Sequence, residues 1–232
     1  MLFCVNSGSW SSEAYFTKNS DAVLTGNQIN TFYSVLGDSQ LNYDALAYAY
    51  TGYTSLVSNE YILVDSIITI IDYTLPSTRE RFFVIDVKNK EILYKTLVAH
   101  GRNSGSDTTL YFSNNPRSYQ SSLGFFVTGN TYNGSKGYSL QLIGLEPGYN
   151  DRAKERSIVI HGADYVSYGF ISHYGRLGRS LGCPAIPVQV SKEIIERIKG
   201  GTLLFAYFHD MQYLHHSEIL NNTFFSHFNT SG

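Results

Sequence analysis

The chain has 232 residues, of which 43% are hydrophobic and 16% are charged, and its formal net charge at pH 7 is −2. The hydrophobic share is enough for a buried core, and so small a charge gives no electrostatic basis for binding nucleic acid or an anionic membrane. The two cysteines, Cys4 and Cys183, are too few for a disulfide framework. No apolar run approaches the roughly 18 residues of a membrane-spanning helix, so no transmembrane segment is predicted.

Residues 1–62 are predicted to form an N-terminal extension with one or two helices. Residues 1–40 are rich in Ser, Asn, Gly and Thr, which indicates loops around one short helix at 25–36. Asn42 is a typical N-cap, and apolar and aromatic residues follow it at helical spacing. A second helix is therefore predicted at 43–57, packed on the main domain. The first residues lack the basic and apolar regions of a secretory signal peptide, so none is evident in this chain.

From Ile67 onward the pattern changes to short strands separated by Gly, Asn and Pro. One late helix is predicted at 190–201, capped by Ser191 and ended by two glycines. This pattern predicts a mainly β domain over 63–210, an antiparallel β-sandwich or half-barrel. Residues 211–232 are predicted to be a solvated C-terminal tail. The predicted strands lie at 67–72, 81–87, 91–100, 124–129, 138–144, 157–161 and 202–208.

The stretch 157–187, SIVIHGADYVSYGFISHYGRLGRSLGCPAIP, holds the residues best suited to chemistry. His161 ends an apolar strand, and Cys183 lies between Gly182 and a proline, which places the thiol on a turn. A thiol nucleophile must ionise, and a nearby imidazole or guanidinium lowers its pKa. We therefore predict that Cys183 is a nucleophile, helped by His161 and by Arg176 and Arg179 just before it. From residue types alone, a structural thiol and a core histidine remain alternatives.

The backbone around Gly182 is predicted to supply free N–H groups for an oxyanion. The second nitrogen of His161 needs an orienting partner, for which a backbone carbonyl is a better candidate than Asp164. His173, in a polar loop, is a weaker alternative base. Arg179 either binds a substrate carboxylate or pins the loop through carbonyl groups. No metal site is predicted, because the C-terminal histidines have no cysteine partners and no ligand spacing.

Two segments, IVIHGADYVS and GRLGRSLGCPAIP, resemble the catalytic-domain family of murein L,D-transpeptidases (the YkuD-like fold), in its branch with Gly-Arg-Ser-x-Gly-Cys-Pro-Ala. Upstream blocks resemble the family in the same order, so the resemblance covers about 67–208. These blocks are IIDYTLPS, FFVIDVKNKEILYKTLVAHGRNSG and FSNNPRSYQSSLGFFVTG. Leu181 stands where the more widespread family motif has histidine.

The resemblance implies a cysteine acyltransferase that acts on peptidoglycan stem peptides outside the cytoplasm, without a cofactor. It implies Cys183 as nucleophile with a thioester intermediate, His161 as base and Gly182 in the oxyanion site. A monomer is expected. An L,D-carboxypeptidase that hydrolyses the same bond and a non-catalytic peptidoglycan-binding module are the alternatives. The residues expected to line the substrate cleft, with ordinary turn chemistry as the alternative for several, are Arg179, Ser180, Gly162, His100, Asn114, Ser121 and Ser122.

Overall fold

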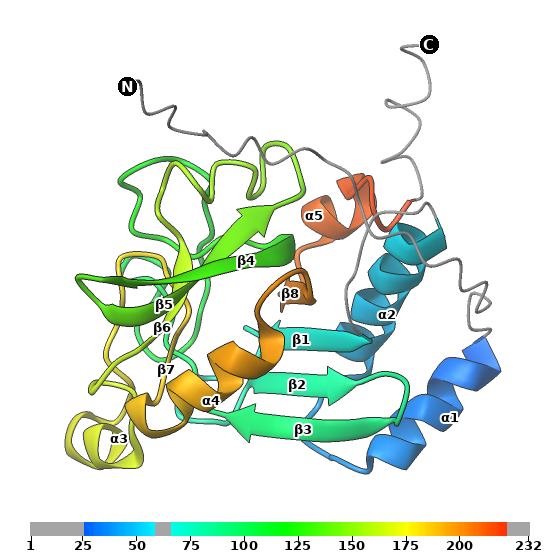
Figure 1. Cartoon of the computed structure of the whole chain (residues 1–232), viewed down its shortest axis with the longest axis horizontal. Helices are drawn as coiled ribbons and strands as arrows, with labels where there is room; N and C mark the ends of the chain where they lie inside the picture. The colour runs from blue at the N-terminus through cyan, green and yellow to red at the C-terminus, as the bar shows by residue number, and fades with distance from the viewer. Residues whose placement is uncertain (1–25, 59–65, 222–232) are drawn as a thin grey trace, which may run out of the picture.

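The computed structural model describes residues 26–58 and 66–221 (Figure 1). Eight strands and five helices are found in these ranges. No helix in them is long and apolar enough to cross a bilayer. The helices are α1 (Gly26–Leu36), α2 (Tyr43–Ser58), α3 (Tyr168–Tyr174), α4 (Val188–Ile198) and α5 (Met211–His216). The strands are β1 (Ile67–Asp72), β2 (Phe82–Asp86), β3 (Glu91–Thr96), β4 (Gly124–Gly134), β5 (Gly137–Gly144), β6 (Val159–Gly162), β7 (Ala185–Ile186) and β8 (Leu203–Tyr207).

The eight strands form one sheet in the order β3-β2-β1-β8-β4-β5-β6-β7. Neighbours are antiparallel except for the β1–β8 and β6–β7 pairs, which are parallel. An isolated bridge joins Ala99, just after β3, to Ala185 in β7, and the Ala99 N–H donates to the Ala185 carbonyl. The two ends of the sheet therefore approach each other, which gives a nearly closed barrel. The prediction of a mainly β half-barrel is confirmed.

Strand β1 is buried along its whole length because both faces of the sheet carry a core. Ile68 and Ile70 pack on one face in a cluster that includes side chains of α1 and α2. Ile67 and Ile71 pack on the other face with residues of β6 and α4. Apolar residues at consecutive positions are typical of such doubly covered strands.

Helix α2 is held against the first of these faces. Asn42 caps it, since Asn42 Oδ1 accepts hydrogen bonds from the N–H groups of Asp44 (2.8 Å) and Ala45 (3.3 Å). A Cβ built on Gly52 would lie 2.2 Å from Cζ of Phe125, so the helix lies directly on that ring. The predicted cap, the helix and its packing on the main domain are confirmed, and α2 shares the core of the sheet.

The prediction of a solvated tail from residue 211 is wrong for 211–221. Residues Met211–His216 form α5, and Tyr213, Leu214 and Ile219 are buried in the core. Their apolar side chains are too widely spaced among polar residues to give a clear sequence pattern. Ser191 was also wrongly predicted as a cap, because α4 begins earlier, at Val188 after Pro187.

Candidate active site

The turn that precedes β7 holds the half-buried Cys183 in place. Ser180 Oγ donates to the Cys183 carbonyl oxygen (2.6 Å) and accepts from the Gly182 N–H (3.1 Å). The φ angle of Gly182 is +123°, and a Cβ there would lie 2.9 Å from the Gln120 carbonyl oxygen. Only glycine fits this position without strain. Leu181 is 54% exposed.

The hydrogen bonds of this turn contradict two expectations from the sequence, one for Gly182 and one for Ser180. The Gly182 N–H is engaged by Ser180 and is not the free oxyanion donor that the sequence suggested. Within the described residues, no hydrogen bond from the Cys183 N–H is found. Ser180 is itself buried, so it shapes the turn and does not face a substrate in this structure.

His161 is 3% exposed and lies in β6. Its Nδ1 is 2.9 Å from the Gly162 carbonyl oxygen, an acceptor only, so Nδ1 carries the proton and donates. Nε2 is then the acceptor nitrogen, as a general base requires. The orienting partner is a backbone carbonyl, as predicted, and Asp164 is exposed.

The parallel pairing of β6 with β7 places the segments that carry the two candidate residues side by side. His161 is in register with Ala185, so the turn with Cys183 runs beside the start of β6. The Cys183 thiol donates to the Ser157 carbonyl (3.5 Å), and the Val159 N–H also hydrogen-bonds the sulfur. Among the described residues, no hydrogen bond joins Cys183 to His161. The register places their two segments side by side, and the two side chains are not a preformed ion pair in this structure.

Burial disfavours the charged form of both groups. Desolvation raises the pKa of the Cys183 thiol, although the Val159 N–H and the Arg156 charge oppose this shift. Desolvation likewise lowers the pKa of His161. The resting site therefore holds a neutral thiol and a neutral imidazole, whereas the sequence suggested a thiol with a lowered pKa.

The side chains of Arg176 and Arg179, the two arginines just before Cys183, bind backbone carbonyls and not the thiol. Arg176 Nη1 donates to the Leu177 carbonyl (2.7 Å). Arg179 Nη1 donates to the carbonyls of Arg102 (3.2 Å) and Gly105 (3.0 Å). Of the two roles open to Arg179, these contacts are those of a loop-pinning residue. The cations whose charges act on the Cys183 sulfur are Arg156 and Lys136, and both lie outside the stretch 157–187.

A hollow of about 150 Å³ lies next to the segment 157–159, and Cys183 is not among the residues that line it. Ser157 and Val159, whose backbone groups contact the sulfur, form part of its wall. Lys154 provides a positive charge, and Tyr132 and Ile143 provide apolar surface. Ser157 and Val159 therefore link the wall of the hollow to the thiol.

His100, expected to line the cleft, is wrongly placed there. It is 1% exposed, and its Nδ1 accepts a hydrogen bond from Nη2 of Arg81 (2.8 Å). Burial and the neighbouring guanidinium lower the pKa of His100 to about 4. Arg81 is fully buried and also donates to the carbonyls of Val98 and Leu75. His100 is part of a buried structural cluster.

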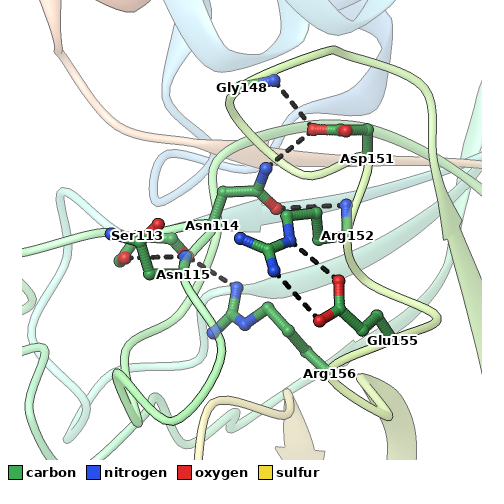
Figure 2. A network of polar contacts seen from close by, with 8 residues as sticks. All are labelled: Ser113, Asn114, Asn115, Gly148, Asp151, Arg152, Glu155 and Arg156. Carbon is green, nitrogen blue, oxygen red and sulfur yellow. Dashed lines mark hydrogen bonds and ion pairs between the residues drawn. The ribbon is translucent and has the colours of Figure 1, made fainter.

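Asn114, Ser121 and Ser122 also make structural contacts. Figure 2 shows Asn114 between two loops: its Nδ2 donates to Asp151 Oδ1 (2.7 Å), and its Oδ1 accepts from the Arg152 N–H (3.2 Å). Ser121 is buried, and its Oγ accepts from the Gly101 N–H (3.0 Å). Ser122 Oγ donates to the Ser113 carbonyl and accepts from Arg156. Turn chemistry, the alternative considered for these blocks, accounts for them in this structure.

Gly162 permits a close approach of α4. A Cβ on Gly162 would lie 2.6 Å from Ser191 Oγ. Its carbonyl orients His161, so its visible contribution is to packing and to the position of the base. A direct substrate contact of Gly162 stays a prediction.

A model of the L,D-transpeptidase catalytic domain matches residues 37–207, and the chain belongs to this family. The resemblance read from the sequence is confirmed at the level of the family. The match includes α2, in keeping with its place in the core. A search of curated proteins gives no match.

Solved structures with a similar fold are distant in sequence. An L,D-transpeptidase from Mycobacterium smegmatis is 11% identical with a TM-score of 0.39, covering 62% of this chain and 59% of that one. One from Mycobacterium tuberculosis is 10% identical (TM-score 0.40; 62% and 58% covered). A helical cell shape determining protein from Campylobacter jejuni is 12% identical (TM-score 0.42; 64% and 49% covered). This chain thus spans less than two thirds of each of these relatives.

Proposed function

We propose that this protein transfers an acyl group from a peptidoglycan stem peptide through a thioester on Cys183, with His161 as general base. Membership of the L,D-transpeptidase catalytic-domain family supports this class of reaction. The register between β6 and β7 is the observation that carries the residue assignment, because it aligns the Cys183 turn with the strand that holds His161. Stem peptides lie outside the cytoplasm, so we expect the protein to act there.

The first step is general-base attack by a neutral thiol. His161 Nε2 takes the proton as the Cys183 sulfur bonds to the substrate carbonyl, which the family resemblance places at the L-centre of a diaminopimelate–D-alanine bond. The tetrahedral intermediate then collapses, the C–N bond breaks, and the leaving amine takes the proton from His161. An acceptor amine next attacks the thioester and releases the thiol. The pKa shifts of both groups favour this order over a preformed thiolate.

The Cys183 N–H is the available donor for the oxyanion of this intermediate. The Gly182 N–H becomes a second donor only if it leaves Ser180 Oγ, which holds it at 3.1 Å. Removing one such donor typically costs about 3 kcal/mol of transition-state stabilisation. The hollow beside Ser157 and Val159 is the site we assign to the substrate peptide.

One observation favours a second candidate, a peptidoglycan-binding module without catalysis. Burial raises the pKa of Cys183, which on its own would leave an unreactive thiol. A carbapenem tests this, because its strained amide acylates an activated thiol. We expect a single covalent adduct in the intact mass of the wild type and none in Cys183→Ser. Absence of an adduct in a folded wild type would leave the binding module.

The acceptor is then tested with a tetrapeptide substrate. Product that appears only when an acceptor amine is present would establish a transpeptidase. Free D-alanine released equally fast without the amine would establish the L,D-carboxypeptidase alternative. Both reactions would use the residues proposed above.

A further inference from the structure

Arg156 lies directly before Ser157, the residue whose carbonyl contacts the Cys183 thiol. Its guanidinium is surrounded by one loop, 113–122. Nη1 donates to the Ser113 carbonyl and to Ser122 Oγ, and Nη2 donates to the Gln120 carbonyl (2.6 Å) and to Ser118 Oγ (3.3 Å). Figure 2 shows Arg156 reaching Ser113 from the chain segment that follows Arg152. A planar fork of this kind fixes both the distance and the angle of the loop it binds.

The same loop lies against the turn that carries the thiol. A Cβ on Gly182 would lie 2.9 Å from the Gln120 carbonyl oxygen and 3.3 Å from Arg156 Nη2. Arg156 therefore binds the loop through the same Gln120 carbonyl that fills the space next to Gly182, and no room is left there for a side chain. A shift of this guanidinium would move the turn that aims Cys183.

The charge of Arg156 is not cancelled by an acid. Its hydrogen-bond acceptors are two carbonyls and two hydroxyls, and no carboxylate pairs with it in the described part of the chain. Arg152, four residues earlier, differs in this respect, because it forms a two-bond ion pair with Glu155. A partly buried, unpaired cation beside a sulfur stabilises the thiolate. The charge of Arg156 does lower the pKa of Cys183, against the effect of burial.

We propose that Arg156 is the positioning residue of the thiol site, which fixes the Gly182–Cys183 turn through loop 113–122 and favours the thiolate that forms during attack. This inference rests on the proposed function, in which Cys183 is the nucleophile. It assigns to Arg156 the electrostatic role that the sequence motif suggested for Arg176 and Arg179.

Arg156→Gln and Arg156→Lys test the proposal, with Arg152→Gln as the matched control. Iodoacetamide alkylation of Cys183 is followed against pH by peptide mass, in a Cys4→Ser background so that one thiol reacts. We expect the inflection in Arg156→Gln to move up by about one pH unit, which slows alkylation about tenfold at neutral pH. Arg156→Lys keeps the charge and loses the fork, so its inflection should stay close to that of the wild type while kcat falls. Arg152→Gln should match the wild type in both measurements.

An unchanged inflection in folded Arg156→Gln would overturn the proposal, as would an equal shift in Arg152→Gln. If Arg156→Gln does not fold, Arg156→Lys decides: a kcat equal to that of the wild type would overturn the positioning role. Alkylation does not require acyl transfer, so the two proposals fail separately. A shifted inflection in a protein that no carbapenem acylates would retain Arg156 as the residue acting on Cys183 and reject the proposed reaction.

Discussion

The imidazole of His161 donates from Nδ1 to the carbonyl oxygen of Gly162, 2.9 Å away, within the same strand. This contact fixes the ring and leaves Nε2 unprotonated, because burial lowers the pKa of His161. As the proposed base, His161 is therefore unprotonated below the pH at which an ordinary histidine would lose its proton.

Replacing His161 with alanine should slow carbapenem acylation of Cys183 by about 10² to 10⁴, the usual contribution of a general base. The wild-type rate should rise with pH through an inflection below about 6.5. Stopped-flow acylation from acidic to neutral pH measures both effects. His173→Ala is the control, because His173 was the alternative base and lies exposed on α3. A comparable loss in His173→Ala would reject His161 as the base.

The buried His100 should make the protein sensitive to acid. Its pKa is about 4 in the fold against about 6.5 in the unfolded chain, so below pH 6.5 the unfolded state binds the extra proton. The stability associated with the neutral ring is complete above pH 6.5 and is lost as the pH falls toward 4. Urea unfolding at pH 7.5 and 4.5 measures how far the free energy of unfolding falls on acidification. This fall should be about 2 to 3 kcal/mol smaller in His100→Gln than in the wild type.

His173→Gln removes an exposed imidazole and serves as the control for this experiment. If its loss of stability on acidification is reduced as much as that of His100→Gln, the buried cluster with Arg81 is not the cause.

Glu146 should have the opposite pH dependence. Its carboxyl group accepts from the Phe125 N–H (2.7 Å) and lies 2.8 Å from the Tyr213 hydroxyl, so it ties β4 to α5. Burial raises the pKa of Glu146 to about 7. The stability associated with its protonated form is complete below about pH 4.5 and is lost as the pH rises through 7. Urea unfolding at pH 5 and pH 8 should show that the free energy of unfolding falls by about 2 to 3 kcal/mol more in the wild type than in Glu146→Gln.

The matched control is Glu91→Gln, at an exposed position of β3. Equal pH slopes for Glu146→Gln and the wild type would show that the buried carboxyl group does not drive the effect. Because His100 and Glu146 act in opposite directions, their contributions to the free energy of unfolding should largely cancel between about pH 4.5 and 6.5.

The sequence predicts elements whose signal is local, and it misses contacts that depend on the closed sheet. The spacing of apolar residues, and the Gly, Asn and Pro residues between elements, predict β1 and α2. One side chain, Asn42, predicts the start of α2. In contrast, β7 has two residues and exists only because it pairs with β6 and Ala99. The sequence suggested Arg179, whereas the cations that act on the thiol are Arg156 and Lys136. The hydrogen-bond partners of Arg156 lie 34 to 43 residues earlier. Such pairings are set by topology and leave no spacing pattern in the chain.

Gly52→Ala tests whether α2 is part of the core. Alanine in place of glycine normally stabilises an exposed helix by about 1 kcal/mol. Here the added methyl group would lie 2.2 Å from Cζ of Phe125, so we expect the free energy of unfolding to fall by about 2 kcal/mol. The control is Gly169→Ala in α3, where the nearest atom to the new Cβ is Ser167 Oγ at 3.9 Å. Denaturant unfolding of both variants should give shifts of opposite sign or clearly unequal size. Equal shifts would mean that α2 is not packed as described.

Asn114→Ala separates a structural from a substrate-binding role. Both ends of the Asn114 amide are used between loops 113–122 and 146–157, by Asp151 and by the Arg152 N–H. Removing them should cost about 1 to 2 kcal/mol of stability and leave KM unchanged within about twofold. Asn115→Ala is the matched control, because the hydrogen bonds found for Asn115 use its backbone: its N–H donates to Ser113 Oγ and its carbonyl accepts from the Ser118 N–H. A several-fold rise in KM for Asn114→Ala with unaltered stability would restore the sequence-based expectation that Asn114 faces the stem peptide.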